Sequence, residues 1–161
     1  MVPMRKSGRR MEDEDAYRLL RESLWVTLST VNARPESPLG LGSPYALPIS
    51  LVESEGQFFF HCALQGHKID NMRKDSRVCI TCVGEAQPNE EAFSVAYQSA
   101  TFFAQAEEVV TKDEKKRVLL SLCKRYAPSQ DPGKQIEAMV DITGVWKLHI
   151  LGCSGKQRKF E

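Results

Sequence analysis

Residues 58–73 read Phe58-Phe59-Phe60-His61-Cys62-Ala63-Leu64-Gln65-Gly66-His67-Lys68-Ile69-Asp70-Asn71-Met72-Arg73. The aromatic run predicts a buried strand over 57–61, which ends at a histidine. A short helix is predicted over 68–74, because Ile69 and Met72 fall on one face of it. A buried strand that leads through a glycine into a segment opening His-Lys can form a cradle for a phosphate group.

The rest of the chain predicts a mainly β protein with short helices. Strands are expected over 24–31, 45–52, 78–84, 94–110 and 144–153, polar loops over 32–44 and 85–93, a turn over 54–56, and helices over 12–23 and 135–140. Pro48 argues for an edge strand or a bulge. Another helix is expected to open with a capping box at Thr111 and Glu114, to end before Pro128, and to bury Val118, Leu119, Leu122 and Tyr126. Six strands without regular βαβ alternation favour an antiparallel sheet closed into a small barrel with helices at its ends.

Composition predicts one soluble domain over residues 1–161, with residues 1–11 as a flexible arm. The chain has 22 Lys and Arg against 21 Asp and Glu, a net charge of +1, so no basic surplus points to nucleic acid. No apolar run approaches membrane-spanning length, and no signal-peptide core is found at the start. The five scattered cysteines favour a reducing cytoplasm.

The segment Gly66-His67-Lys68 is a candidate anion site. Gly66 lets the backbone approach a ligand, and a helix that starts near Lys68 would point its free N–H groups and its dipole at the same place. His67 and Lys68 add donors, and Asn71 adds an amide one turn later. These groups suit a phosphate monoester and do not form a Walker loop. A solvated lysine on a surface helix remains the alternative on local chemistry alone.

His61 lies where the aromatic strand leaves the sheet. There it can donate a hydrogen bond or titrate near neutral pH, or it can be a core histidine satisfied by the backbone. A metal site is not expected, because Cys79 and Cys82 would point to opposite faces of one strand. No Gly-x-Ser-x-Gly motif supports a hydrolase.

Several segments together resemble a known family: Leu28-Ser29-Thr30-Val31, Pro48-Ile49-Ser50, Phe59-Phe60-His61-Cys62-Ala63, Gly66-His67-Lys68-Ile69-Asp70-Asn71, Leu148-His149-Ile150 and Ser154-Gly155-Lys156. The chain resembles the flavin-binding split-barrel family related to pyridoxamine 5'-phosphate oxidase, in its nitroimidazole-resistance branch. The likeness runs in order from about residue 16 to 157. It implies a homodimer of six-stranded antiparallel split β-barrels with peripheral helices, each binding FMN in a groove at the subunit interface.

The resemblance also implies roles for particular residues. The flavin phosphate would be held by His67, Lys68 and Asn71. The ring or ribityl chain would be lined by Ser50 and by the run His61, Cys62 and Ala63, with His61 as the residue nearest the redox chemistry. Looser matches for contacts to the ring or from the partner subunit are Ser99 and Trp146.

The implied function is an FMN-dependent oxidoreductase that reduces a small electrophilic substrate such as a nitroaromatic. The alternative is a carrier or sensor that binds flavin, haem or deazaflavin without turnover, and a barrel with no cofactor is a third reading. Two departures from the family pattern stand out. The loop 32–44 is long and rich in Pro and Gly, and the arginines that bind substrate phosphate in true pyridoxamine phosphate oxidases have no clear match, which argues against vitamin B6 oxidation.

Overall fold

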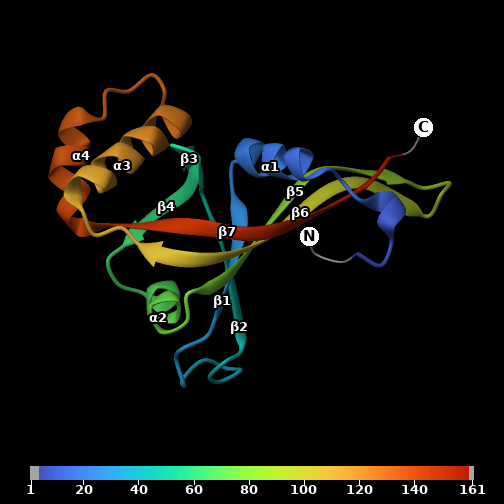
Figure 1. Cartoon of the computed structure of the whole chain (residues 1–161), viewed down its shortest axis with the longest axis horizontal. Helices are drawn as coiled ribbons and strands as arrows, with labels where there is room; N and C mark the ends of the chain where they lie inside the picture. Colours follow the sequence, from blue (N-terminus) through green and yellow to red (C-terminus); the bar gives the residue numbers. More distant parts are fainter. Residues whose placement is uncertain (1–3, 160–161) are drawn as a thin grey trace.

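The computed structural model describes residues 4–159, which form one curled sheet with helices around it (Figure 1). Seven strands run in the order β2-β1-β5-β6-β7-β4-β3, and all neighbours are antiparallel. The strands are β1 (Val26–Val31), β2 (Pro44–Ile49), β3 (Val52–Ser54), β4 (Gln57–Ala63), β5 (Arg77–Asn89), β6 (Ser94–Glu108) and β7 (Thr143–Arg158). The predicted antiparallel split barrel is therefore confirmed, with seven strands in place of six.

The additional strand arises where the chain turns from one edge of the sheet to the other. The strand predicted over 45–52 is broken at Ser50 and Leu51, so that β2 and β3 become the two edge strands. Leu51 is buried in the core at this corner. Ser50 and Leu51 connect the two edges of the sheet covalently, and β2 and β3 are not paired with each other by a ladder of hydrogen bonds. Pro48 lies in an edge strand, as expected.

The main core lies inside the curled sheet and under helix α1 (Asp13–Glu22). The helix buries Ala16, Leu19 and Leu20, and the Tyr17 ring meets the edge of Phe102 at 5.1 Å between centroids. This core is mostly aliphatic, and its largest buried side chains are Phe58, Phe60, Phe102 and Trp146, each of which removes a large apolar area from water. The predicted helix over 12–23 is confirmed to within one residue at each end.

Helices α3 (Lys112–Tyr126) and α4 (Gly133–Met139) cover a second apolar cluster on the other side of β4. Val118, Leu119 and Leu122 are buried there as predicted, whereas Tyr126 is 37% exposed. The Tyr126 hydroxyl donates to the carbonyl of Leu51 at 2.8 Å, which links the end of α3 to the corner between β2 and β3.

The capping box at the start of α3 is not formed. Thr111 occupies the N-cap position, but its side chain makes no capping hydrogen bond, and only its carbonyl accepts from Lys115 N at 3.1 Å. None of the helices among residues 4–159 is long and apolar enough to cross a bilayer.

β5, β6 and β7 continue beyond the barrel as a three-stranded ribbon, directed away from α3 and α4 (Figure 1). The loop predicted over 85–93 is wrong, because β5 extends to Asn89 and only residues 90–93 form the turn. The polar residues of this segment are exposed, so the segment carries no apolar alternation that would mark it as a strand. Pairing with β6 supplies its hydrogen bonds.

The predicted N-terminal arm meets the sheet before residue 12. Residues 1–3 lie outside the described part of the chain, and residues 7–9 form a 3-10 turn. The backbone of Arg10 forms an isolated antiparallel β-bridge with Lys156 of β7. Met11 is 1% exposed, and its N–H donates to Gly155 O at 3.0 Å. The end of the arm is thus anchored beside the ribbon.

Candidate functional site

The predicted anion cradle lies between the end of β4 and the start of helix α2 (His67–Lys74) (Figure 1). Gly66 is the N-cap residue and has φ +143°, a conformation that side-chain-bearing residues rarely adopt. Its carbonyl accepts from the N–H groups of Ile69 and Asp70 at 2.9 and 3.1 Å. The N–H groups of His67 and Lys68 meet no backbone acceptor in the described chain. They remain available for an anion at the positive end of the helix.

Lys68 places a cation beside this helix start. No carboxylate among residues 4–159 lies within ion-pair distance of its ammonium group. By contrast, the neighbouring Arg34 and Arg73 are each paired, with Asp70 and Glu108. The positive charge of Lys68 therefore faces the end of β4 without being neutralised, which suits an anionic ligand.

The charge of Lys68 affects the pKa values of His61 and Cys62 at the end of β4. His61 is exposed, but the protein around its imidazole displaces part of the surrounding water, which lowers its pKa below the usual value, and the charge of Lys68 lowers that pKa further. Burial raises the pKa of the Cys62 thiol, although Lys68 acts in the opposite direction. At neutral pH the site therefore presents a neutral imidazole and a protonated thiol, and Cys62 is not an activated nucleophile.

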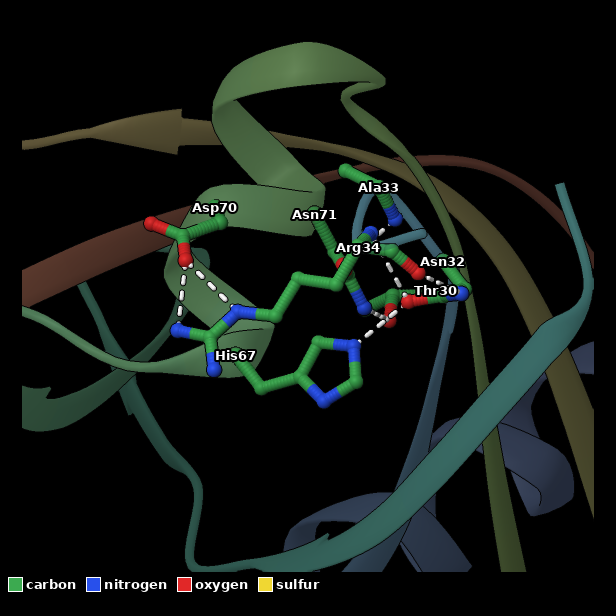
Figure 2. A network of polar contacts seen from close by, with 7 residues as sticks. All are labelled: Thr30, Asn32, Ala33, Arg34, His67, Asp70 and Asn71. Carbon is green, nitrogen blue, oxygen red and sulfur yellow. Dashed lines mark hydrogen bonds and ion pairs between the residues drawn. The ribbon is translucent and has the colours of Figure 1, made fainter. Parts of the chain in front are cut away.

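Asn71 is fully buried, with 0% of its surface exposed. Its Oδ1 accepts from Ala33 N at 2.8 Å, and its Nδ2 donates to Thr30 Oγ1 at 2.8 Å (Figure 2). Both ends of the amide are engaged inside the protein, so Asn71 is not free to bind a phosphate as the resemblance implied. It instead fixes α2 against β1 and the following loop.

His67 is held from the same loop. Its Nε2 lies 2.5 Å from Asn32 Oδ1, and its ring centroid lies 4.0 Å from that of Tyr45 (Figure 2). Next to it, Arg34 donates to Asp70 Oδ2 from Nε and from a terminal nitrogen, at 2.9 and 2.6 Å. The helix start is thus tied to the loop 32–44 by several polar contacts, and the orientation of His67 is fixed before any ligand arrives.

The family model described as pyridoxamine 5'-phosphate oxidase matches residues 12–157. The chain belongs to this family. No curated protein matches the chain significantly.

Solved structures share the fold of this family member at low identity. A conserved hypothetical protein from Mycobacterium tuberculosis is 16% identical, with TM-score 0.78, over 96% of this chain and 90% of that one. A candidate 5-nitroimidazole antibiotic resistance protein from Bacteroides thetaiotaomicron is 18% identical, with TM-score 0.73, over 90% and 83%. An FAD and haem binding protein from Mycobacterium smegmatis is 18% identical, with TM-score 0.72, over 92% and 72%.

In this member of the pyridoxamine 5'-phosphate oxidase family, some of the predicted site residues lie together. His61, Cys62 and Ala63 end β4 opposite Val145, Gly144 and Thr143 of β7, immediately before the cradle. Ser50 lies half-buried at the corner between β2 and β3. Among residues 4–159, no group of three or more His, Cys, Asp or Glu side chains is arranged to hold a metal.

Trp146 and Ser99 are placed elsewhere. Trp146 is 2% exposed, and its indole Nε1 meets no hydrogen-bond acceptor in the described chain, although it lies close enough to Cys62 to lower the pKa of that thiol. It is a residue of the main core. Ser99 lies opposite Lys156 in the ladder between β6 and β7. His61 lies opposite Val145, which is eleven residues (156 minus 145) earlier in β7. Along an extended strand that separation is roughly 35 Å, so Ser99 lies far from the end of β4 in its own chain.

Sequence reasoning missed the residues that organise the cradle from behind: Thr30, Asn32, Arg34 and Tyr45. One local signal was present. An Asn at the start of a loop rich in Gly and Pro often bonds to backbone groups near it, and Asn32 does so here. The contact with His67, 35 residues away, had no local signal.

Proposed function

We propose that this chain binds FMN, with the flavin phosphate at Gly66, His67 and Lys68. The observation that carries the proposal is the unneutralised ammonium of Lys68 beside free N–H groups at the start of α2. This donor set fits a phosphate dianion and does not fit a metal ion. Family membership supports a phosphate-bearing cofactor, and the similar protein from M. smegmatis is described as binding FAD.

We further propose that the protein is an oxidoreductase for small electrophiles such as nitroaromatics. Bound FMN would supply the electron chemistry, so the protein need only bind, orient and exclude water. The flavin ring would lie along Ser50 and the end of β4, where neutral His61 can donate or accept one hydrogen bond at the ring or substrate. The fold shared with a candidate nitroimidazole resistance protein supports this substrate class.

The test begins with the purified protein. We expect it to carry a yellow cofactor whose released mass is that of FMN, and NAD(P)H without oxygen should bleach it. Bleaching by dithionite but not by NAD(P)H would favour a carrier over an enzyme. A released mass matching deazaflavin or haem, or a protein that binds no added FMN, would contradict the assignment.

We propose that two copies associate through the outer face of the central strands. The register aligns small or uncharged residues in rows across β1, β5, β6 and β7: Ser29, Cys79, Phe103 and Gly152 in one row, and Thr27, Thr81, Thr101 and Ser154 in the next. A hollow of about 520 Å³ adjoins these rows, with Trp25 and Val83 exposed on its wall. An uncharged face of this kind suits a second copy and would bring its Ser99 toward the flavin.

Replacing Thr101 by arginine tests this face. Two-fold symmetry would bring a charge from each subunit into the interface, and like charges there cost several kcal/mol, so dimer affinity should fall about a hundredfold or more. Light scattering after gel filtration should show a monomer at concentrations where the parent is a dimer. Ser129→Arg, on an exposed turn after α3, is the matched control and should stay dimeric. A dimeric Thr101→Arg protein would place the interface elsewhere.

A further inference from the structure

Asn32 has an amide whose orientation is set by its surroundings. It is 2% exposed. Its Nδ2 donates to Arg34 O at 2.8 Å and to Gly40 O at 2.6 Å, and its Oδ1 accepts from Arg34 N at 3.1 Å. Flipping the amide would turn its oxygen toward two carbonyl oxygens and its NH₂ group toward an N–H donor. Oδ1 must therefore be the atom that faces His67 (Figure 2).

An acceptor opposite Nε2 decides the protonation of the His67 ring. The 2.5 Å contact requires a proton on Nε2, because two acceptors at that distance would repel each other. In the neutral ring the other nitrogen, Nδ1, then carries a lone pair. Nδ1 lies on the side of the ring turned away from Asn32 (Figure 2), and it has no hydrogen-bond partner in the described part of the chain.

We propose that Asn32 is a positioning residue that keeps a proton on His67 Nε2 and turns Nδ1 toward the flavin phosphate, so that FMN binding takes up one proton. The proposal rests on the phosphate assignment made above. A neutral Nδ1 would oppose a phosphate oxygen with its lone pair, whereas a protonated Nδ1 donates a charge-assisted hydrogen bond. His67 would thus bind the phosphate as an imidazolium.

The other charged and titratable groups around His67 would not produce this dependence of FMN affinity on pH. They are Lys68 and Asp70 on α2, Arg34 in the loop, Tyr45 on β2 and His61 at the end of β4. Lysine, arginine, tyrosine and carboxylate side chains ordinarily titrate outside the range of about pH 6.5–8.5. His61 lies beside the ring position proposed for the flavin, so its titration would affect flavins with and without a phosphate alike.

The first measurement needs no flavin. Nitrogen-15 NMR of labelled flavin-free protein at about pH 8 distinguishes protonated from unprotonated ring nitrogens, and His67→Gln assigns the signal among the three histidines. We expect His67 to carry its proton on Nε2 alone. Asn32→Ala removes the acceptor and should give a mixture of the two tautomers. Protonation on Nδ1 in the parent protein would overturn the proposal, even if the Asn32→Ala variant fails to fold.

The second measurement compares FMN with riboflavin, which lacks the phosphate. Between about pH 8.5 and 6.5, above the second phosphate pKa of about 6, FMN affinity should rise relative to riboflavin affinity as the pH falls, by up to tenfold per unit. In His67→Gln this rise should vanish, and FMN affinity at the lower pH should fall about tenfold. Asn32→Ala should reduce the rise, while Lys74→Ala, on the exposed last turn of α2, should keep it.

The outcomes separate the proposal from the function on which it rests. If neither flavin binds, the proposed function fails, and the tautomer of His67 still decides the role of Asn32. If FMN binds with a pH dependence equal to that of riboflavin, the cofactor assignment stands and the proton uptake at His67 is wrong.

Discussion

Lys68→Ala is expected to weaken FMN binding about tenfold or more while the protein stays folded. Charge-assisted hydrogen bonds contribute roughly 1.5–3 kcal/mol each, and Lys68 is the cation beside the start of α2 that no carboxylate in the described chain neutralises. Its removal therefore subtracts binding free energy and breaks no ion pair among residues 4–159. Fluorescence titration with FMN measures the affinity, and thermal unfolding of the flavin-free variant measures the fold.

Lys74→Ala is the matched control for this variant. Lys74 lies on the last turn of the same helix and is exposed, so its removal should leave FMN affinity within about twofold of the parent. Riboflavin provides a second comparison, since it should bind the parent and Lys68→Ala almost equally. Equal FMN affinity of Lys68→Ala and Lys74→Ala would mean that the phosphate lies elsewhere.

Asn71→Ala should instead destabilise the whole protein, by roughly 2–5 kcal/mol. Truncation leaves the buried N–H of Ala33 without its acceptor, which costs about 1–3 kcal/mol. It also removes the hydrogen bond that the Thr30 hydroxyl accepts, worth about 0.5–1.5 kcal/mol, while that hydroxyl keeps its bond to Tyr45 O at 3.4 Å. Urea unfolding followed by circular dichroism should show a lower midpoint with an unchanged slope. A residue that merely touched a ligand would leave the free energy of unfolding of the flavin-free protein unchanged.

Thr30→Val sharpens this test, because it removes one partner of Asn71 with little change in shape. If the two residues act through their hydrogen bond, the double variant should lose less stability than the sum of the single variants. Additive losses would show that Asn71 stabilises the fold through other contacts.

The barrel itself was predictable because its strands follow local rules. The β-branched run in β1 and the aromatic run in β4 each predict a strand, and both appear where expected. The break at Ser50 and Leu51 had little signal, since the segment from Tyr45 to Val52 is apolar apart from Ser50 and contains no glycine. The tertiary requirement to pass from one edge of the sheet to the other decides that corner.

Half of the candidate site was also predictable. A glycine followed by His-Lys at a helix start has a local physical meaning, and the structure shows that turn and helix. The burial of Asn71 was not predictable, because an amide on a short helix is usually solvated, and its partners lie 38 and 41 residues away. Likewise, Trp146 on the last strand gave no sign of which face of the sheet would receive its ring.

The corner at Ser50 and Leu51 leaves the sheet with edges that resist aggregation. β3 has only three residues, and β2 contains Pro44 and Pro48, which lack an N–H. Prolines are tolerated in a ladder where they face away from the paired strand, so of the outward positions 44, 46 and 48 only Ala46 can donate to an incoming strand. An extended segment of another chain therefore has few free N–H groups with which to pair at this edge of the sheet. The sheet is thus poorly suited to elongate into a fibril through its edges.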